Sequence, residues 1–143
     1  MARMSITFPG FDDLAAEIDR AGGNLEAAVE DALLQTQEFI QNGLIMAAAP
    51  YNAKGLKGYA TGKMFGSIID DRKIYFKGTV AEVRVGFELD TGFHSIFIMY
   101  GTPRIAKDQK VYNAIRGTKT QKEIWELQES VMRKHLNLGG ENG

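Results

Sequence analysis

The chain has 143 residues, 44% of them hydrophobic and 24% charged, which predicts one globular domain over residues 1–143 and excludes a disordered chain. Its 17 basic and 18 acidic side chains give a formal net charge of −1, so charge offers no reason to expect nucleic acid as the main partner, although a local basic patch can still exist. The absence of cysteine excludes disulfides and cysteine-based metal sites, and it suits assembly in a reducing cytoplasm.

The N-terminal part of the chain predicts a short strand and a short helix. Residues Ser5 to Phe8 alternate weakly before a Pro-Gly turn, and we expect them to form a strand or an arm. Phe11 to Ala21 can form a helix with Leu14 and Ile18 on one face, ended by the glycine pair that follows. The first eight residues lack the apolar core of a signal peptide, and no apolar run in the chain is long enough to span a bilayer.

The strongest periodic signal covers residues 24–48. Apolar side chains recur there at spacings of three and four, as on one face of an α-helix, while polar residues such as Gln37 fall largely off that face. Asn24 is a good N-cap, because its side chain can accept a hydrogen bond from an otherwise unpaired backbone N–H. Pro50 should end the helix, since the residue before a proline is pushed out of the α region. We therefore expect a long helix from about Asn24 to Ala48.

Residues 51–61 predict an exposed, flexible loop, because they are rich in Gly, Lys and Tyr and show no periodicity. Basic and aromatic residues are interleaved in this loop and just after it: Tyr51, Lys54, Lys57, Tyr59, Lys63 and Phe65. Such a mixture can bind single-stranded nucleic acid. The net charge near zero favours the other interpretation, in which these side chains dock on a neighbouring subunit.

The apolar period changes to two after residue 73. Ile74 and Phe76 alternate with polar or amphipathic residues, as do Val83 and Val85, and a glycine-containing turn separates the two runs. This pattern predicts a β-hairpin. The segment Phe93 to Tyr100 is apolar without a clean period, so it can be a third strand or a buried helical turn.

The C-terminal part predicts two further helical segments. Gln109 to Ile115 should form one or two helical turns. Thr120 and Glu123 match a capping box and predict a helix from about Lys122 to Leu136, with a frayed tail over residues 138–143. The order of elements predicts an α+β fold, in which a small antiparallel sheet packs against a long N-terminal helix and a C-terminal helix.

The sequence contains few candidates for chemistry. His94 and His135 lie far apart and show no metal-binding spacing, and His135 is better explained as a favourable charge at the end of a helix. A hydrolase would have to use His94 as a base with Asp90 or Asp71, but no set of nucleophile, base and orienting group can be assembled. We therefore expect no enzymatic activity, no cofactor and no metal.

Two further sequence features also give only weak evidence for a catalytic or ligand-binding site. The adjacent carboxylates Asp70 and Asp71 would point to opposite faces of a strand, so a solvated turn is favoured over a cation site. Ser67 lacks the G-x-S-x-G context of a nucleophile, and residues 55–66 lack the residue order of a phosphate-binding loop.

Three stretches, in order along the chain, carry a resemblance to a known family. They are residues 47–50 followed by 61–68 (AAAP and TGKMFGSI), residues 81–86 (AEVRVG) and residues 94–102 (HSIFIMYGT). Together they resemble the tail-component proteins of long-tailed bacteriophages, which are linked to tail completion and head–tail joining. The matching positions are Pro50, Thr61, Gly62, Met64, Ser67, Ile68, Gly86, Tyr100, Gly101 and Thr102.

The chain also departs from the family's pattern. Met99 stands where the family often has a glutamate, residues 107–109 replace an arginine–proline pair, and the loop 51–60 is longer than usual. These differences concern the exact docking surface and not the class of protein. They leave the docking surface open.

The resemblance implies a tail-terminator-like fold and a structural role in a ring of identical subunits, usually a hexamer. The implied partners are the head connector or stopper on one side and the tail tube on the other. DNA would pass through the ring without being specifically bound, and no membrane is involved. The implied location is the tail or neck of the virion, after assembly in the cytoplasm of the bacterial host. The alternative, a nucleic-acid-binding module that uses the Lys/Tyr-rich loop 51–65, predicts tight binding with steep salt dependence.

Overall fold

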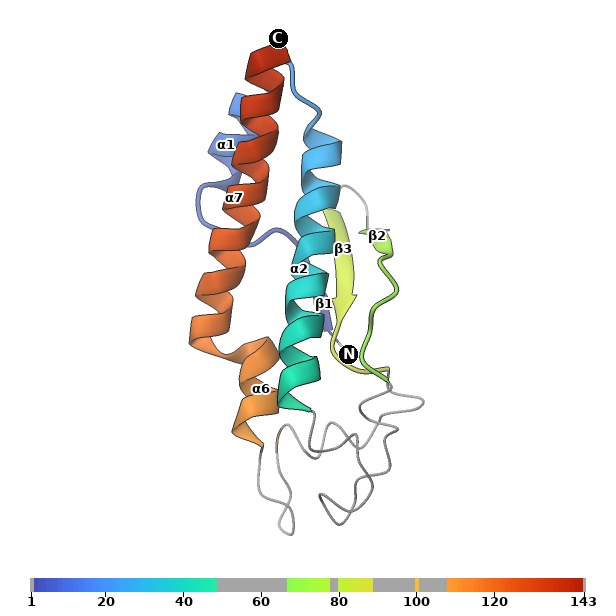
Figure 1. The fold of residues 1–143 in the computed structure, drawn as a ribbon. Coiled ribbons are helices and arrows are strands. Elements are labelled where there is room, and N and C mark those ends of the chain that lie inside the picture. The colour runs from blue at the N-terminus through green and yellow to red at the C-terminus, as the bar shows by residue number, and fades with distance from the viewer. Residues whose placement is uncertain (1, 49–66, 78–79, 89–99, 101–107, 143) are drawn as a thin grey trace.

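The structure is a computed structural model that describes residues 2–48, 67–77, 80–88, 100 and 108–142. Two long helices lie side by side, and a small sheet packs on one of them (Figure 1). The described part is therefore α+β, with a three-stranded antiparallel sheet. The elements are β1 (Ala2–Met4), α1 (Phe11–Arg20), α2 (Leu25–Ala47), β2 (Ile74–Lys77), β3 (Val80–Val85), α6 (Gln109–Arg116) and α7 (Thr118–Asn142).

The N-terminal strand lies earlier than predicted. Strand β1 covers Ala2–Met4, and Ser5 to Phe8 form an arm without regular secondary structure, which was one of the two alternatives expected for that segment. The reason is that two backbone groups of that segment bind a side chain of α7. The amide of Gln128 accepts from the backbone N–H of Thr7 and donates to the carbonyl of Ser5, at 2.9 and 3.2 Å.

Helix α2 is the central element of the core. Its N-cap is Asn24, whose side chain accepts a hydrogen bond from the backbone N–H of Ala27, as predicted. One side of α2 packs on the sheet and α6, in a cluster that includes Leu33, Ile40 and Val83. The other side packs on α1 and α7 through Ala28 and Ala32, among others. Every layer of the described fold thus depends on this helix.

The predicted hairpin is confirmed as β2 and β3, and β3 is the middle strand of the order β1-β3-β2. Val83 and Val85 alternate with outward-facing residues and are buried against α2. Gly86, with φ of 105°, ends β3 in a conformation that a side chain would disfavour. Beyond it, Ile68 and Phe87 form an isolated bridge that extends the pairing towards Ser67.

The two C-terminal helices meet at a short connection. Asp108 caps α6, since its side chain accepts from the backbone N–H groups of Lys110 and Val111. The predicted capping box at Thr120 was wrong, because α7 already begins at Thr118 and the Thr120 hydroxyl donates instead to the carbonyl of Asn113 in α6. That bond ties the two helices together.

Helix α7 also continues past the predicted end at Leu136 to Asn142, so the tail expected to fray over 138–143 is helical up to that residue. Gly139 and Gly140 each weaken the helix by about 1 kcal/mol, but unlike proline they keep their backbone N–H donors, so the helix can continue through them. None of the helices in the described part combines the length and apolar character that crossing a bilayer requires.

Candidate interaction surfaces

A buried glutamine holds the start of the hairpin against α2. Gln37 is 2% exposed, although its position in the sequence suggested the polar side of the helix. Its amide nitrogen donates to a carboxylate oxygen of Asp71 and to the carbonyl of Arg84, and its amide oxygen accepts from the backbone N–H of Arg72. The amide of Gln37 therefore binds β3 and the residues just before β2, so this side chain fixes the position of the sheet on α2. Arg72, which it holds, has a positive φ of 51°.

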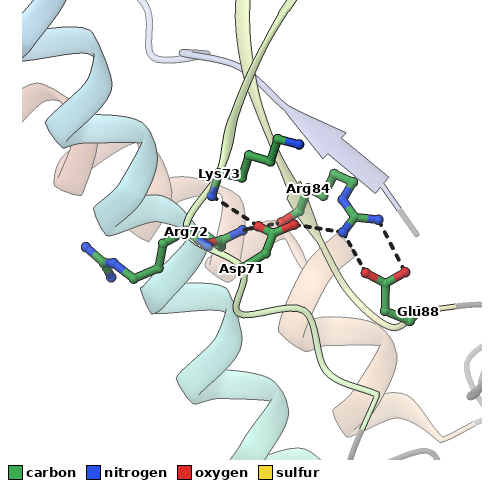
Figure 2. A network of polar contacts seen from close by, with 6 residues as sticks. Asp71, Arg72, Lys73, Arg84 and Glu88 are labelled. Carbon is green, nitrogen blue, oxygen red and sulfur yellow. Dashed lines mark hydrogen bonds and ion pairs between the residues drawn. The ribbon is translucent and has the colours of Figure 1, made fainter.

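The guanidinium of Arg84 lies between two carboxylates (Figure 2). Its Nη2 donates to Asp71 at 2.7 Å and to Glu88 at 2.6 Å, and its Nη1 donates to the second oxygen of Glu88 at 3.2 Å. The hydrogen bonds to Asp71 and Glu88 raise the pKa of Arg84, which stays charged. The prediction of Asp71 as a solvated turn residue therefore needs correction, because it joins α2 to β3.

The same contacts lower the pKa of Asp71. Burial alone would raise the pKa of this carboxyl group, but hydrogen bonds from Arg84, Gln37 and the backbone of Lys73 outweigh that effect, and the nearby charge of Arg84 adds to it. The carboxylate is thus a fixed anion of the fold. It is held in one geometry by three donors, and that geometry explains its role without a metal ion.

The outer face of the sheet gathers cations around one tyrosine. Tyr75 has the guanidinium carbons of Arg3 and Arg84 at 5.1 and 5.6 Å from its ring centre, and the Lys73 ammonium at 5.0 Å. Arg3 lies directly opposite Arg84 in the strand pairing, which is a repulsive arrangement unless other groups compensate it. The two carboxylates on Arg84 and the face of the ring provide that compensation.

A second buried amide network ties three distant segments together. Gln128 of α7 is fully buried, and besides binding the N-terminal arm it donates to the hydroxyl of Thr36 in α2 at 3.1 Å. That hydroxyl donates in turn to the carbonyl of Ala32. Both ends of the Gln128 amide are therefore satisfied inside the core, and the network has a structural role.

His135 also has a structural partner. Its Nε2 lies 2.9 Å from a carboxylate oxygen of Asp31 in α2. The pKa of Asp31 is lowered, and the hydrogen bond from Gln35 is the largest cause. Burial acts in the opposite direction, while the hydrogen bond and charge of His135 lower the pKa further. The contact connects α2 to α7, which the interpretation of His135 as a simple helix-end charge did not anticipate. Within the described residues, no group of three or more His, Asp or Glu side chains could hold a metal ion.

An apolar groove opens between the last turns of α2 and the junction of α6 with α7. It encloses about 570 Å³ and is lined mainly by apolar atoms. Met46 stands in it with 81% of its surface exposed. Gly43 also faces it, and a Cβ at this position would lie 3.8 Å from the Cβ of Ala114, so packing among the described residues does not require a glycine here. The groove is lined by Phe39, Asn42, Gly43, Met46, Ala47, Lys110, Asn113, Ala114, Thr120 and Glu123.

Large apolar side chains are also exposed at the hairpin. Phe76 of β2 is 63% exposed and Val80 at the start of β3 is 48% exposed. The register places them on opposite faces of the hairpin, because Phe76 pairs with Ala81 and Val80 with Lys77. Phe76 lies on the edge strand β2, where another chain could approach. The groove and the hairpin lie on different sides of α2, with α6 at one side and β2 at the other (Figure 1).

The structure describes only part of the predicted sites. Ser67 is buried, Ile68 packs against the core, Gly86 ends β3, and Tyr100 makes an edge-to-face contact with Tyr112 at 5.7 Å between ring centres. The suspected interface residues and the other matching positions lie outside the described residues, as do His94 and Asp90. They are Tyr51, Lys54, Lys57, Tyr59, Lys63 and Phe65, with Pro50, Thr61, Gly62, Met64, Gly101 and Thr102.

Comparison with protein-family models, with curated proteins and with solved structures found no match to this chain. The surfaces must therefore be interpreted from their own chemistry. Sequence reasoning missed the groove and the roles of Gln37 and Gln128. The periodicity of the sequence could have flagged only Met46 and Gly43, whose apolar or small side chains lie near the end of a long helix.

Proposed function

We propose that this chain is a structural, non-enzymatic subunit of a tailed bacteriophage, which forms a ring that completes the tail and joins it to the head connector or stopper. The observation that carries the proposal is the presence of two separate exposed apolar sites, the groove beside Met46 and Phe76 on the edge strand β2. Contiguous exposed apolar surface is typical of protein–protein contacts. The resemblance of residues 47–102 to tail-component proteins supplies the biological setting.

Two different surfaces favour a ring over a two-fold dimer. A contact between unlike surfaces repeats from one subunit to the next and closes when the rotation permits. The sheet supports the same interpretation, because β1 and β2 pair only with β3 within the described part and leave two edges for neighbours. A long helix on a small sheet is also consistent with the tail-terminator-like fold that we propose.

The polar clusters support a structural role. Gln37 and Gln128 each join elements that are distant in the sequence, and the Arg84 ion pairs fasten the residues that flank the hairpin strands. In this proposal the subunit works by holding shape, with the tail tube and the head connector as partners, in the neck of the virion. DNA passes through the ring.

The first test is the solution mass of the purified chain by light scattering over a wide range of concentrations. We expect one mass that is a fixed multiple of the 15.8 kDa chain and a ring with a central hole in negative-stain electron microscopy. A mass of one chain at every concentration would contradict self-assembly into a ring.

The tail assignment needs its own test. We expect the purified ring to bind the ends of tubes assembled from the tail-tube protein encoded in the same genome, and to stop their growth. Rings that leave tube length and tube ends unchanged would contradict a role in tail completion while leaving ring formation intact.

A further inference from the structure

Helix α1 presents an acidic outer face. Its ten residues include four carboxylates and one guanidinium, and all five of these side chains are exposed, while Leu14 and Ile18 are buried. None of the four carboxylates forms an ion pair with any residue in the described part of the chain. We call the set the acidic face: Asp12, Asp13, Glu17 and Asp19.

The junction of α6 with α7 carries the opposite charge. Four exposed cations surround it, and we call them the basic elbow: Lys110, Arg116, Lys119 and Lys122. Among the described residues their one ion pair is a contact of 4.0 Å between Lys119, whose side chain is 92% exposed, and Glu123. Two other carboxylates lie near these cations: Asp108 caps α6, and Glu126 lies one turn after Lys122. The elbow is therefore a local basic patch on a chain whose net charge is near zero.

Several of these charges have the wrong sign for their own helix. The N-terminus of a helix favours anions and the C-terminus favours cations, by about 0.3–1 kcal/mol per charge. Lys119 and Lys122 nevertheless lie in the first turns of α7, and Asp19 lies one residue before the end of α1. The helix dipole therefore favours Asp12 and Asp13 but not Lys119 or Asp19, and it has little effect on Lys122, which lies in the second turn of α7.

The two surfaces are separate on one molecule. Helix α1 packs on the part of α7 around Val131 and Met132, whereas the elbow surrounds its first turns, roughly 16 Å away along the helix axis. Figure 1 shows α1 beside one part of α7 and α6 at its other end. The acidic face therefore cannot reach the elbow of its own chain, although a second copy can bring the two together.

We propose that the acidic face of α1 in one copy docks on the basic elbow of the next copy, and that this contact propagates the ring. The inference rests on the proposed function, because it assumes that identical chains associate. It specifies unlike, charge-complementary surfaces, as a ring requires. The apolar groove borders the elbow, since Lys110 and Glu123 line it, so a neighbour on the elbow also covers exposed Met46.

Reversing the charges of either surface tests the contact, with substitutions chosen so that each helix stays folded. Variant A is Lys119→Glu with Lys122→Glu, and variant B is Glu17→Lys with Asp19→Lys. Variant B places charges that suit the end of α1, so its melting temperature should stay close to that of the wild type. In variant A the favourable charges at the start of α7 are offset by like charges four residues apart, beside Glu123 and Glu126, so its melting temperature should be slightly lower. At low salt each variant alone should lose the ring-sized mass in light scattering. An equimolar mixture of A and B should recover it, since each unlike pair of surfaces is complementary again.

A matched control places the same change of charge elsewhere. Arg133→Glu with Lys134→Glu reverses two exposed cations farther along α7 and likewise removes one i,i+4 ion pair, so it should leave the ring mass unchanged. Assembly of the wild type should weaken as salt is raised, because exposed charges are screened beyond about 10 Å at 0.1 M salt.

The outcomes separate the two proposals. A wild-type chain that stays monomeric overturns the ring itself. A wild-type ring that persists in variants A and B, or a mixture that fails to recover it, overturns the docking of α1 on the elbow alone. Loss of binding to a single-stranded oligonucleotide in variant A, with the ring mass unchanged, would assign the elbow to nucleic acid and likewise overturn the contact.

Discussion

Two polar networks hold the described fold together, and they do so by different physical means. Gln128 is neutral and fully buried, and it binds the N-terminal arm and α2 from α7. Arg84 is charged and partly exposed, and it binds Asp71 and Glu88 beside the sheet. A buried neutral hydrogen-bonding group contributes little net stability while its hydrogen bonds are made, but removing it leaves its partners unpaired and is strongly destabilising. Ion pairs near solvent are screened by water and salt, and their contribution depends on pH. The Gln128 network should therefore be needed for stability at every pH and salt concentration, whereas the contribution of the Arg84 network should depend on both.

The largest effect should come from Gln128→Ala. The change leaves the Thr7 N–H and the Ser5 carbonyl without their partner and opens a cavity in the core, so we expect a loss of about 2–4 kcal/mol in the free energy of unfolding. Chemical denaturation measures this quantity. Glu126→Ala, at an exposed position of the same helix, is the control and should change stability by less than about 0.5 kcal/mol. Equal effects of both changes would contradict the role of the Gln128 network in stability.

Arg84→Met should have a smaller effect. It keeps most of the apolar packing of the side chain but leaves Asp71 and Glu88 without their shared cation, and partial exposure limits the loss to about 1–2 kcal/mol. Arg3→Met is the control, because Arg3 shares that face of the sheet but has no carboxylate partner among the described residues. A loss as large as that of Gln128→Ala would show that solvent screens this network less than its exposure suggests.

Lowering the pH should weaken the Arg84 network but not the Gln128 network. The folded pKa of Asp71 is lowered from its ordinary value of 3.8, so its contribution is complete above that value and disappears as pH falls through the lower folded pKa. Asp71→Asn should therefore lose less stability than the wild type as the pH falls below about 4. Asp31, whose pKa is also lowered, is unchanged in both proteins and cancels in the difference. Parallel stability curves for the two proteins would contradict this role of Asp71.

The smallest effect should come from Thr120→Val. Its hydroxyl makes one exposed hydrogen bond to Asn113, which is neither buried nor charged, and we expect a loss of about 0.5–1 kcal/mol. Thermal unfolding measures the difference, with Thr118→Val, at the first residue of α7, as the control. A loss above about 2 kcal/mol would mean that the connection between α6 and α7 depends on this bond.

The elements with local signals were predictable from the sequence. Asn24 indicated the start of α2 through its capping chemistry, and the change of period after residue 73 indicated the hairpin. The partners of Gln37 and Gln128 were not predictable, because they lie 34 to 123 residues away and a glutamine on a helix normally indicates a solvent-exposed position. The start of α7 was missed for a related reason, since Thr120 bonds to the preceding helix and not to its own.

The bonds of Gln128 also impose an order on biosynthesis. Ser5 and Thr7 leave the ribosome more than a hundred residues before the side chain that satisfies them. Until α7 is translated, the backbone of this arm remains hydrated and the face of α2 around Thr36 has no cover. Contacts of such long sequence separation form late, because chain closure must precede them. The nascent chain should therefore resist proteases only after the last helix has emerged.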